Sequence, residues 1–151
     1  PEELFVAGLL HDIGRLIFME YFSEPYNKLI VEAKSGEKKL IDLEDGSFGI
    51  NHAELGFMIS KKWRFPSLLQ NCVRYHHLVI DDSIKEANQV YVVKVANNLV
   101  KFAQLGASGD TKIEENILSE SGANKINSTD LNQIIMTLNE DISTIQHYFE
   151  L

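Results

Sequence analysis

Imidazole and carboxylate side chains are the residues of this sequence whose types and spacing could do chemistry. His11 and Asp12 are adjacent in an otherwise apolar stretch, His52 begins a predicted helix, and His76-His77 close another. Imidazole and carboxylate together suit borderline divalent metals such as iron, manganese, zinc or nickel. Burying Asp12 without a partner would cost on the order of several kcal/mol. We therefore expect His11, Asp12, His52 and at least one of His76 and His77 to converge on one cleft.

Each of these residues also has a purely structural explanation. A single histidine at a helix end is usually a capping or packing residue, and a buried hydrogen-bonded network would satisfy Asp12 as well as a metal would. The residues alone leave both interpretations open. Cys72, the only cysteine, falls among apolar residues and is expected to fill space in the core. A single cysteine excludes an intrachain disulfide and favours a cytoplasmic protein.

The elements that must position these side chains are predicted to be helices, and no stretch has a convincing strand pattern. Apolar residues recur at helical spacing from Glu3 to Phe18, and Asn51 with Glu54 forms an N-terminal capping signal for the helix that follows. The glycines of Glu44–Gly49 predict a loop. The helix that follows Asn51 is expected to end at Trp63. Further helices are expected over Ser23–Ala33, after the turn at Ser35-Gly36, from Pro66 to His76-His77, from Ile84 to Gln104 and from Ser128 onward.

Length and charge indicate one acidic domain. The 151 residues suffice for a single core and carry a formal net charge of −8, so we expect no nucleic-acid partner. No apolar run approaches a membrane span, and we expect no membrane association. The fold class predicted is all-α, with one domain over 1–151 that includes a loop-rich connection at 106–128 and a final helix at 129–150. Since the chain opens directly into an apolar helix without an initiator Met, we expect it to be the C-terminal part of a longer protein.

Several motifs resemble the HDOD branch of the HD phosphohydrolase superfamily. The stretch from Phe5 to Leu16 with its His11-Asp12 pair resembles the signature helix of that superfamily. The motifs that follow resemble the HDOD pattern in order and spacing; they are Glu44, Gly49–Gly56, Trp63, Pro66, Arg74–His77 and Val95–Leu99. The resemblance covers about Phe5 to Ala103 and implies an HD-superfamily-like helical bundle.

The resemblance also implies a set of metal ligands. In catalytic HD proteins an upstream histidine, the His-Asp pair and a later aspartate hold one metal. Here the pair is His11 and Asp12, and the later aspartate aligns with Asn97, whose neutral amide is a weaker ligand. Binuclear relatives add histidines that correspond to His52, His76 and His77. The first metal site is therefore expected to be eroded, while the second retains its residues and could hold one divalent ion or none.

The leading functional hypothesis is a bacterial signal-transduction output module that contacts other signalling proteins or domains. The alternative is a metal-dependent phosphohydrolase or phosphodiesterase acting on a nucleotide or cyclic dinucleotide, with Asp12 as ligand or base. In that case Arg15 could meet a phosphate. The Gly-Tyr-Pro motif of cyclic-dinucleotide phosphodiesterases does not follow His76-His77, where the sequence reads Leu78–Asp82. A third interpretation is a structural domain whose histidines form a hydrogen-bonded core.

Overall fold

A computed structural model shows an all-helical protein, which confirms the predicted fold class. It describes residues 2–81, 83–104, 109–113 and 128–149. The helices of these residues are, in chain order, α1 (Glu2–Leu10), α2 (Ile13–Tyr21), α3 (Ser23–Ala33), α4 (Leu40–Phe48), α5 (His52–Lys62), α6 (Ser67–Tyr75), α7 (Ala87–Phe102) and α8 (Ser128–Phe149). None of the helices in the described ranges is long and apolar enough to cross a membrane.

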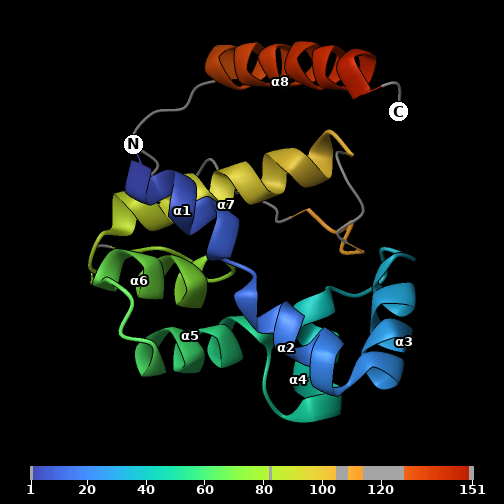
Figure 1. Cartoon of the computed structure of the whole chain (residues 1–151), viewed down its shortest axis with the longest axis vertical. Coiled ribbons are helices and arrows are strands. Elements are labelled where there is room, and N and C mark those ends of the chain that lie inside the picture. Colours follow the sequence, from blue (N-terminus) through green and yellow to red (C-terminus); the bar gives the residue numbers. More distant parts are fainter. Residues whose placement is uncertain (1, 82, 105–108, 114–127, 150–151) are drawn as a thin grey trace.

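Helices α1 to α7, whose arrangement Figure 1 shows, contribute to or pack against two hydrophobic clusters. The first cluster is formed by α1, α6 and α7 together with the segment between α6 and α7; its buried members are Ala7, Leu69, Cys72, Ile80, Val90, Tyr91, Val93 and Val95. The second is formed by α2, α3 and α4; its buried members are Phe18, Tyr26, Ala33, Leu40 and Leu43. Helix α5 packs against α2 and α6, so it connects the two clusters.

The single helix predicted from Glu3 to Phe18 is two helices separated by a turn at His11-Asp12. In a continuous helix the carbonyl of Gly8 would accept a hydrogen bond from the backbone N–H of Asp12. Here the Nδ1 atom of His11 lies 2.7 Å from that carbonyl oxygen and donates to it instead. The backbone N–H of Arg15 in turn bonds to the carbonyl of Asp12 at 2.9 Å, which starts α2. Asp12 therefore lies at an elbow between the two clusters.

The loop predicted over Glu44–Gly49 is wrong, because α4 continues through Phe48. Gly46 lies inside the helix, and only Gly49 has the left-handed conformation (φ 68°) that ends it. Burial overrides the low helix propensity of glycine here, since Leu43 and Glu44 both point into the interior. The continued helix is what places the Glu44 carboxylate beside α5.

Helices α2 and α5 approach each other through two glycines. A Cβ atom on Gly14 would overlap the carbonyl oxygen of His52 and lie 2.8 Å from the backbone nitrogen of Gly56. A Cβ atom on Gly56 would lie 2.8 Å from a methyl carbon of Val73. The start of α5 is fixed by Asn51, whose side-chain oxygen accepts from the N–H of Glu54 at 3.0 Å, as the capping signal predicted. This close packing sets the separation between Asp12 and His52.

Beyond α7, a short segment returns to the second cluster. Asp110 pairs with Lys101 of α7 at 2.6 Å, and both side chains are almost fully buried. Lys112 donates to the carbonyl of Glu37 at 2.9 Å, before α4. Most of the connection predicted at 106–128 lies outside the described residues, and α8 follows as a separate helix beyond α7 in Figure 1.

Replacement of Gly14 by Ala should destabilise the protein and disturb the histidine site together. The added Cβ has no space between the backbones of α2 and α5, so we expect a loss of at least about 1–3 kcal/mol in the free energy of unfolding. Urea denaturation measures this change. Gly8→Ala is the matched control, because its Cβ would meet no atom within 4 Å and alanine favours a helix. Equal stabilities of the two variants would contradict the packing described here.

Candidate metal centre

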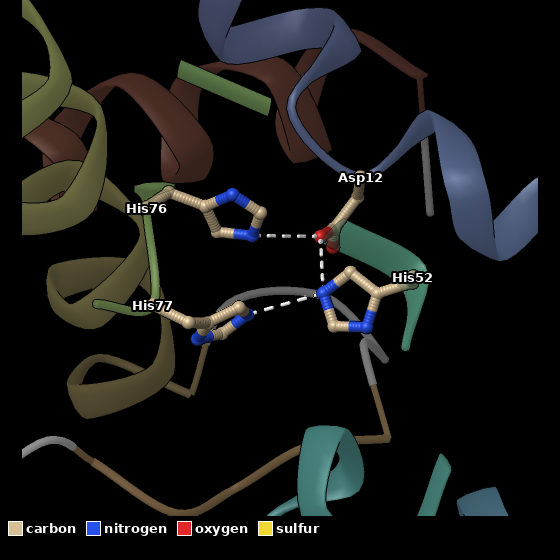
Figure 2. Close-up of side chains that lie close together, drawn as sticks. All are labelled: Asp12, His52, His76 and His77. Atoms are coloured by element: carbon tan, nitrogen blue, oxygen red, sulfur yellow. Dashed lines mark hydrogen bonds and ion pairs between the residues drawn. The ribbon is translucent and has the colours of Figure 1, made fainter. Parts of the chain in front are cut away.

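The structure brings four of the predicted ligands to one point from three places in the chain (Figure 2). Asp12 comes from the elbow between α1 and α2, His52 from the first position of α5, and His76 and His77 from the end of α6. One potential ligand atom from each residue lies within 4.8 Å of the others. Asp12 Oδ1 is 3.3 Å from His52 Nε2 and 3.4 Å from His76 Nε2, and the Nε2 atoms of His52 and His77 are 3.1 Å apart.

The outer nitrogens of three histidines are fixed as donors by their surroundings. His11 Nδ1 faces the Gly8 carbonyl, and His76 Nδ1 faces the carbonyls of Cys72 and Val73 at 3.1 and 2.9 Å. Since a carbonyl oxygen only accepts, each of these nitrogens carries the proton. In the neutral imidazole the other nitrogen, Nε2, then presents a lone pair. The Nε2 atoms of His11 and His76 and the Oδ1 atom of Asp12 are buried without any hydrogen-bond partner among the described residues.

Glu44 fixes the third imidazole. Its Oε2 atom accepts from Nδ1 of His52 at 2.6 Å and from the backbone N–H of His52 at 2.8 Å. Its Oε1 atom accepts from the hydroxyl of Tyr26 at 2.7 Å. Glu44 is fully buried, so these three hydrogen bonds replace its hydration. A carboxylate that holds the outer nitrogen of a histidine is the usual support for a metal-binding imidazole.

Arg15 neutralises the outer side of the Asp12 carboxylate. Its guanidinium lies 3.1 Å from Asp12 Oδ2, which leaves Oδ1 to face the imidazoles. Burial opposes the ionised form of Asp12, but its contacts with His52, His76 and His11 outweigh burial and hold the pKa of this carboxyl well below its ordinary value. Asp12 is therefore a carboxylate at neutral pH.

The two buried histidines respond to this environment in opposite directions. Burial opposes protonation of His52, but the neighbouring carboxylates of Asp12 and Glu44 outweigh it and raise the pKa of His52 to about 9. Burial dominates at His76 and lowers its pKa. Without a metal, His52 therefore holds a proton at neutral pH, and that proton is the positive charge between the carboxylates.

The donor set fits a divalent cation. Metal–ligand distances of about 2.1 Å place neighbouring ligand atoms about 3.0–3.4 Å apart in octahedral or tetrahedral geometry. Three of the separations within this set, 3.1, 3.3 and 3.4 Å, lie in this range, and all of its ligand atoms lie within 4.8 Å of one another. Asp12, His52, His76 and His77 would hold the ion, and water would complete its shell. The buried atoms of Asp12 and His76 that lack a hydrogen-bond partner would become ligands.

The other predicted site residues lie around this set. His11 Nε2 is 3.6 Å from Asp12 Oδ1, and the His11 ring packs edge-on against His76, but His11 is not one of the four clustered residues. Asn97 is half-buried on α7, and among the described residues no hydrogen bond joins it to the cluster. Arg15 pairs with Asp12 Oδ2 at 3.1 Å, and its predicted contact with a phosphate stays a prediction. Cys72 is buried, and burial raises the pKa of its thiol to about 12, as befits a packing residue.

Two residues that matter to the site were not predicted to belong to it. Glu44 was predicted only as part of an HDOD motif, and no role was predicted for Tyr26. Neither has a local signal, because a lone glutamate in a helix is usually exposed and a lone tyrosine has no burial preference that would mark it. The spacing of eight residues between Glu44 and His52 becomes informative only once α4 is known to extend to Phe48.

Comparison with known proteins identifies the family. The sequence model of the HDOD domain family matches residues 1–79, more than half of the chain. The chain belongs to the HDOD family.

Two similar proteins place the chain in a wider context. An uncharacterized protein of Treponema pallidum (strain Nichols) is 25% identical over 112 residues, which cover 74% of this chain and 21% of the relative. The crystal structure of an HDOD domain protein with unknown function from Geobacter sulfurreducens superimposes with a TM-score of 0.69 at 22% identity. That match covers 95% of this chain and 51% of the crystallised chain. The chain thus spans about a fifth of the first relative and about half of the second.

The metal-free protein should lose stability as the pH rises from 7 to 10. A folded-state pKa of about 9 for His52, above its unfolded value near 6.5, stabilises the fold at low pH. This contribution disappears as the pH rises through 9 and is on the order of 2–3 kcal/mol. The lowered pKa of His76 acts in the opposite direction below about 6.5, so the comparison starts at pH 7. Urea denaturation in the presence of a chelator measures the effect.

Glu44→Gln tests the cause of this pH dependence. Loss of the buried carboxylate should lower the pKa of His52, which NMR titration of the imidazole reports directly, and should reduce the fall in stability between pH 7 and 10. An unchanged pKa of His52 in this variant would show that Glu44 does not hold its charge.

Proposed function

We propose that this chain is a regulatory output module of a bacterial, cytoplasmic signalling protein. In this proposal it binds one divalent metal ion, which stabilises the fold and does not catalyse hydrolysis. Asp12, His52, His76 and His77 hold the ion in this proposal. Iron, manganese, zinc or nickel suits a ligand set of imidazoles and one carboxylate. The metal would supply a cross-link between the elbow, α5 and α6.

The observation that carries the proposal is the convergence of lone pairs. His52 and His76 each donate a proton outward through Nδ1, and their Nε2 atoms face the buried oxygen of Asp12. Lone pairs directed at one another repel unless a cation lies between them. A proton on His52 satisfies part of this demand, and a divalent ion satisfies all of it. With His52 protonated, Asp12 Oδ1 has a positive charge beside it, but the buried Nε2 atom of His76 still lacks a hydrogen-bond partner among the described residues.

The residues present argue against hydrolysis. Asn97, which aligns with the later aspartate of catalytic HD proteins, makes no hydrogen bond to the cluster among the described residues. Arg15, the cation nearest to the site, is paired with Asp12. A two-metal mechanism requires ligands for both ions, and the four clustered residues provide for one.

An output role is supported by the apolar surface next to the centre. Leu9 and Leu16 are 72% and 62% exposed on either side of the Asp12 elbow, and Met19 is 48% exposed. With Leu10 and Ile13 they line an open pocket whose polar members are Asp12 and Arg15. Exposed apolar surface of this kind marks protein contacts. A partner docked here would lie directly over the outer side of the Asp12 carboxylate.

Metal titration tests the centre. The purified metal-free protein should bind one equivalent of manganese, iron or zinc, and His52→Ala should abolish saturable binding. His147→Ala, which removes an exposed imidazole of α8, is the control and should bind as wild type does. Affinity should fall as the pH decreases from 9 toward 6, because the metal must displace the proton of His52. Absence of saturable binding to wild type would refute the centre, and equal binding by His52→Ala would move it elsewhere.

An assay of hydrolysis tests whether the protein is regulatory rather than catalytic. The metal-loaded protein should show no metal-dependent hydrolysis of cyclic dinucleotides or nucleoside monophosphates above the rate with Asp12→Ala. Product analysis by chromatography measures this. A metal-dependent rate that vanishes in Asp12→Ala would restore the phosphohydrolase hypothesis.

A further inference from the structure

A second cavity adjoins the histidine cluster through His77. It lies between the first turn of α5 and the end of α6, has a volume of about 130 Å³, and is closed by one residue of α4. Its lining residues are Ile41, Asn51, Ala53, Glu54, Arg74, Tyr75, His77 and Leu78. In Figure 2, His77 lies beside His52 and below His76, and of the four clustered residues it is the one that the described lining of this cavity includes.

We propose that this cavity binds a short-chain monocarboxylate, with Arg74 as the receptor for the carboxylate. The inference goes beyond the proposed function, because it requires no metal. Since His77 belongs to both places, an occupant of the cavity would lie next to the metal centre.

Arg74 is an exposed cation whose guanidinium stacks on aromatic rings. Its guanidinium carbon lies 4.4 Å from the ring centre of Phe57 and 5.2 Å from that of Tyr75. Among the described residues no carboxylate lies within ion-pair distance of it. Stacking on aromatic rings fixes the plane of a guanidinium while leaving its N–H groups available. A carboxylate can accept two such N–H groups side by side.

Two further groups of the cavity can donate to an anion. At the start of α5, the N–H groups of His52 and Glu54 are taken by Glu44 and Asn51. The N–H of Ala53 lies between them, and the described residues supply no acceptor for it. The hydroxyl of Tyr75 likewise has no hydrogen-bond partner in the described part of the chain. Together with Arg74 these donors favour an anion at this end of α5.

Charge and size select a singly charged, partly apolar ligand. Among the described lining residues Arg74 is the only lysine or arginine and Glu54 is acidic, so a dianion such as phosphate is less favoured than a monoanion. Ile41, Ala53 and Leu78 provide apolar walls. A volume of about 130 Å³ lies below the range of about 300–1,000 Å³ typical of drug-sized ligands. An aliphatic acid of two to four carbons meets all three conditions.

Titration with acetate, propionate and butyrate tests the proposal on the metal-free protein. Amide shifts in NMR spectra should saturate and should be largest at Ala53 and Tyr75. Each added methylene should tighten binding about three- to fourfold, from an apolar contribution of about 0.8 kcal/mol. Arg74→Gln should weaken the binding of butyrate at least about tenfold, because the charge-assisted hydrogen bonds between the guanidinium and the carboxylate are lost.

The matched control is Lys61→Gln. Lys61 lies over the same Phe57 ring, 5.4 Å from its centre, but does not line the cavity, so this variant should bind butyrate as wild type does. The inference fails if butyrate shows no saturable shifts, if Arg74→Gln binds it unchanged, or if inorganic phosphate binds more tightly than butyrate. Metal titration of the same samples tests the metal centre independently of the butyrate titration. Butyrate binding without metal binding would refute the proposed metal centre alone, and the reverse result would refute this inference alone.

Discussion

The arrangement of the whole site depends on one charge, the carboxylate of Asp12, which is held among imidazoles at the junction of two hydrophobic clusters. A carboxylate in such a place must be compensated. Arg15 compensates one oxygen, and the histidines compensate the other. The position of one of those histidines, His52, depends in turn on a second carboxylate, Glu44, which accepts a hydrogen bond from Tyr26. The interior of this protein is thus organised around two acids and the positive charge between them.

Close packing of the backbones sets the short distances between Asp12 and the imidazoles. Gly14 and Gly56 let α2 and α5 approach until a side chain no longer fits between them. The break between α1 and α2 turns Asp12 toward His52, and the Asn51 cap starts α5 at His52 itself. Each device is local, yet together they bring residues forty positions apart in the sequence to within 3.3 Å.

The sequence predicts most of the fold because its apolar periodicity is regular. It predicts that His11, Asp12, His52 and at least one of His76 and His77 converge because a buried charge needs partners, and the structure clusters Asp12 and His52 with both His76 and His77 but without His11. It does not predict the elbow at His11-Asp12, since both residues tolerate a helix and the break arises from a side chain that competes for the Gly8 carbonyl. It misassigns Glu44–Gly49 because glycine signals a turn locally, whereas burial of Leu43 and Glu44 decides the outcome. Glu44 and Tyr26 escape detection because their role exists only across helices.

The position of Asp12 at the elbow has a mechanical consequence. Helix α1, before the elbow, contributes to the first cluster, and α2, after it, contributes to the second. Helix α5 packs against both α2 and α6, and so contacts an element of each cluster. Any rocking of the two halves against each other would pull the carboxylate away from the imidazoles. The charge cluster would therefore restrain motion of the two clusters relative to each other. A change in its protonation or in its metal occupancy would change the rate at which backbone amides on both sides of the elbow exchange with solvent.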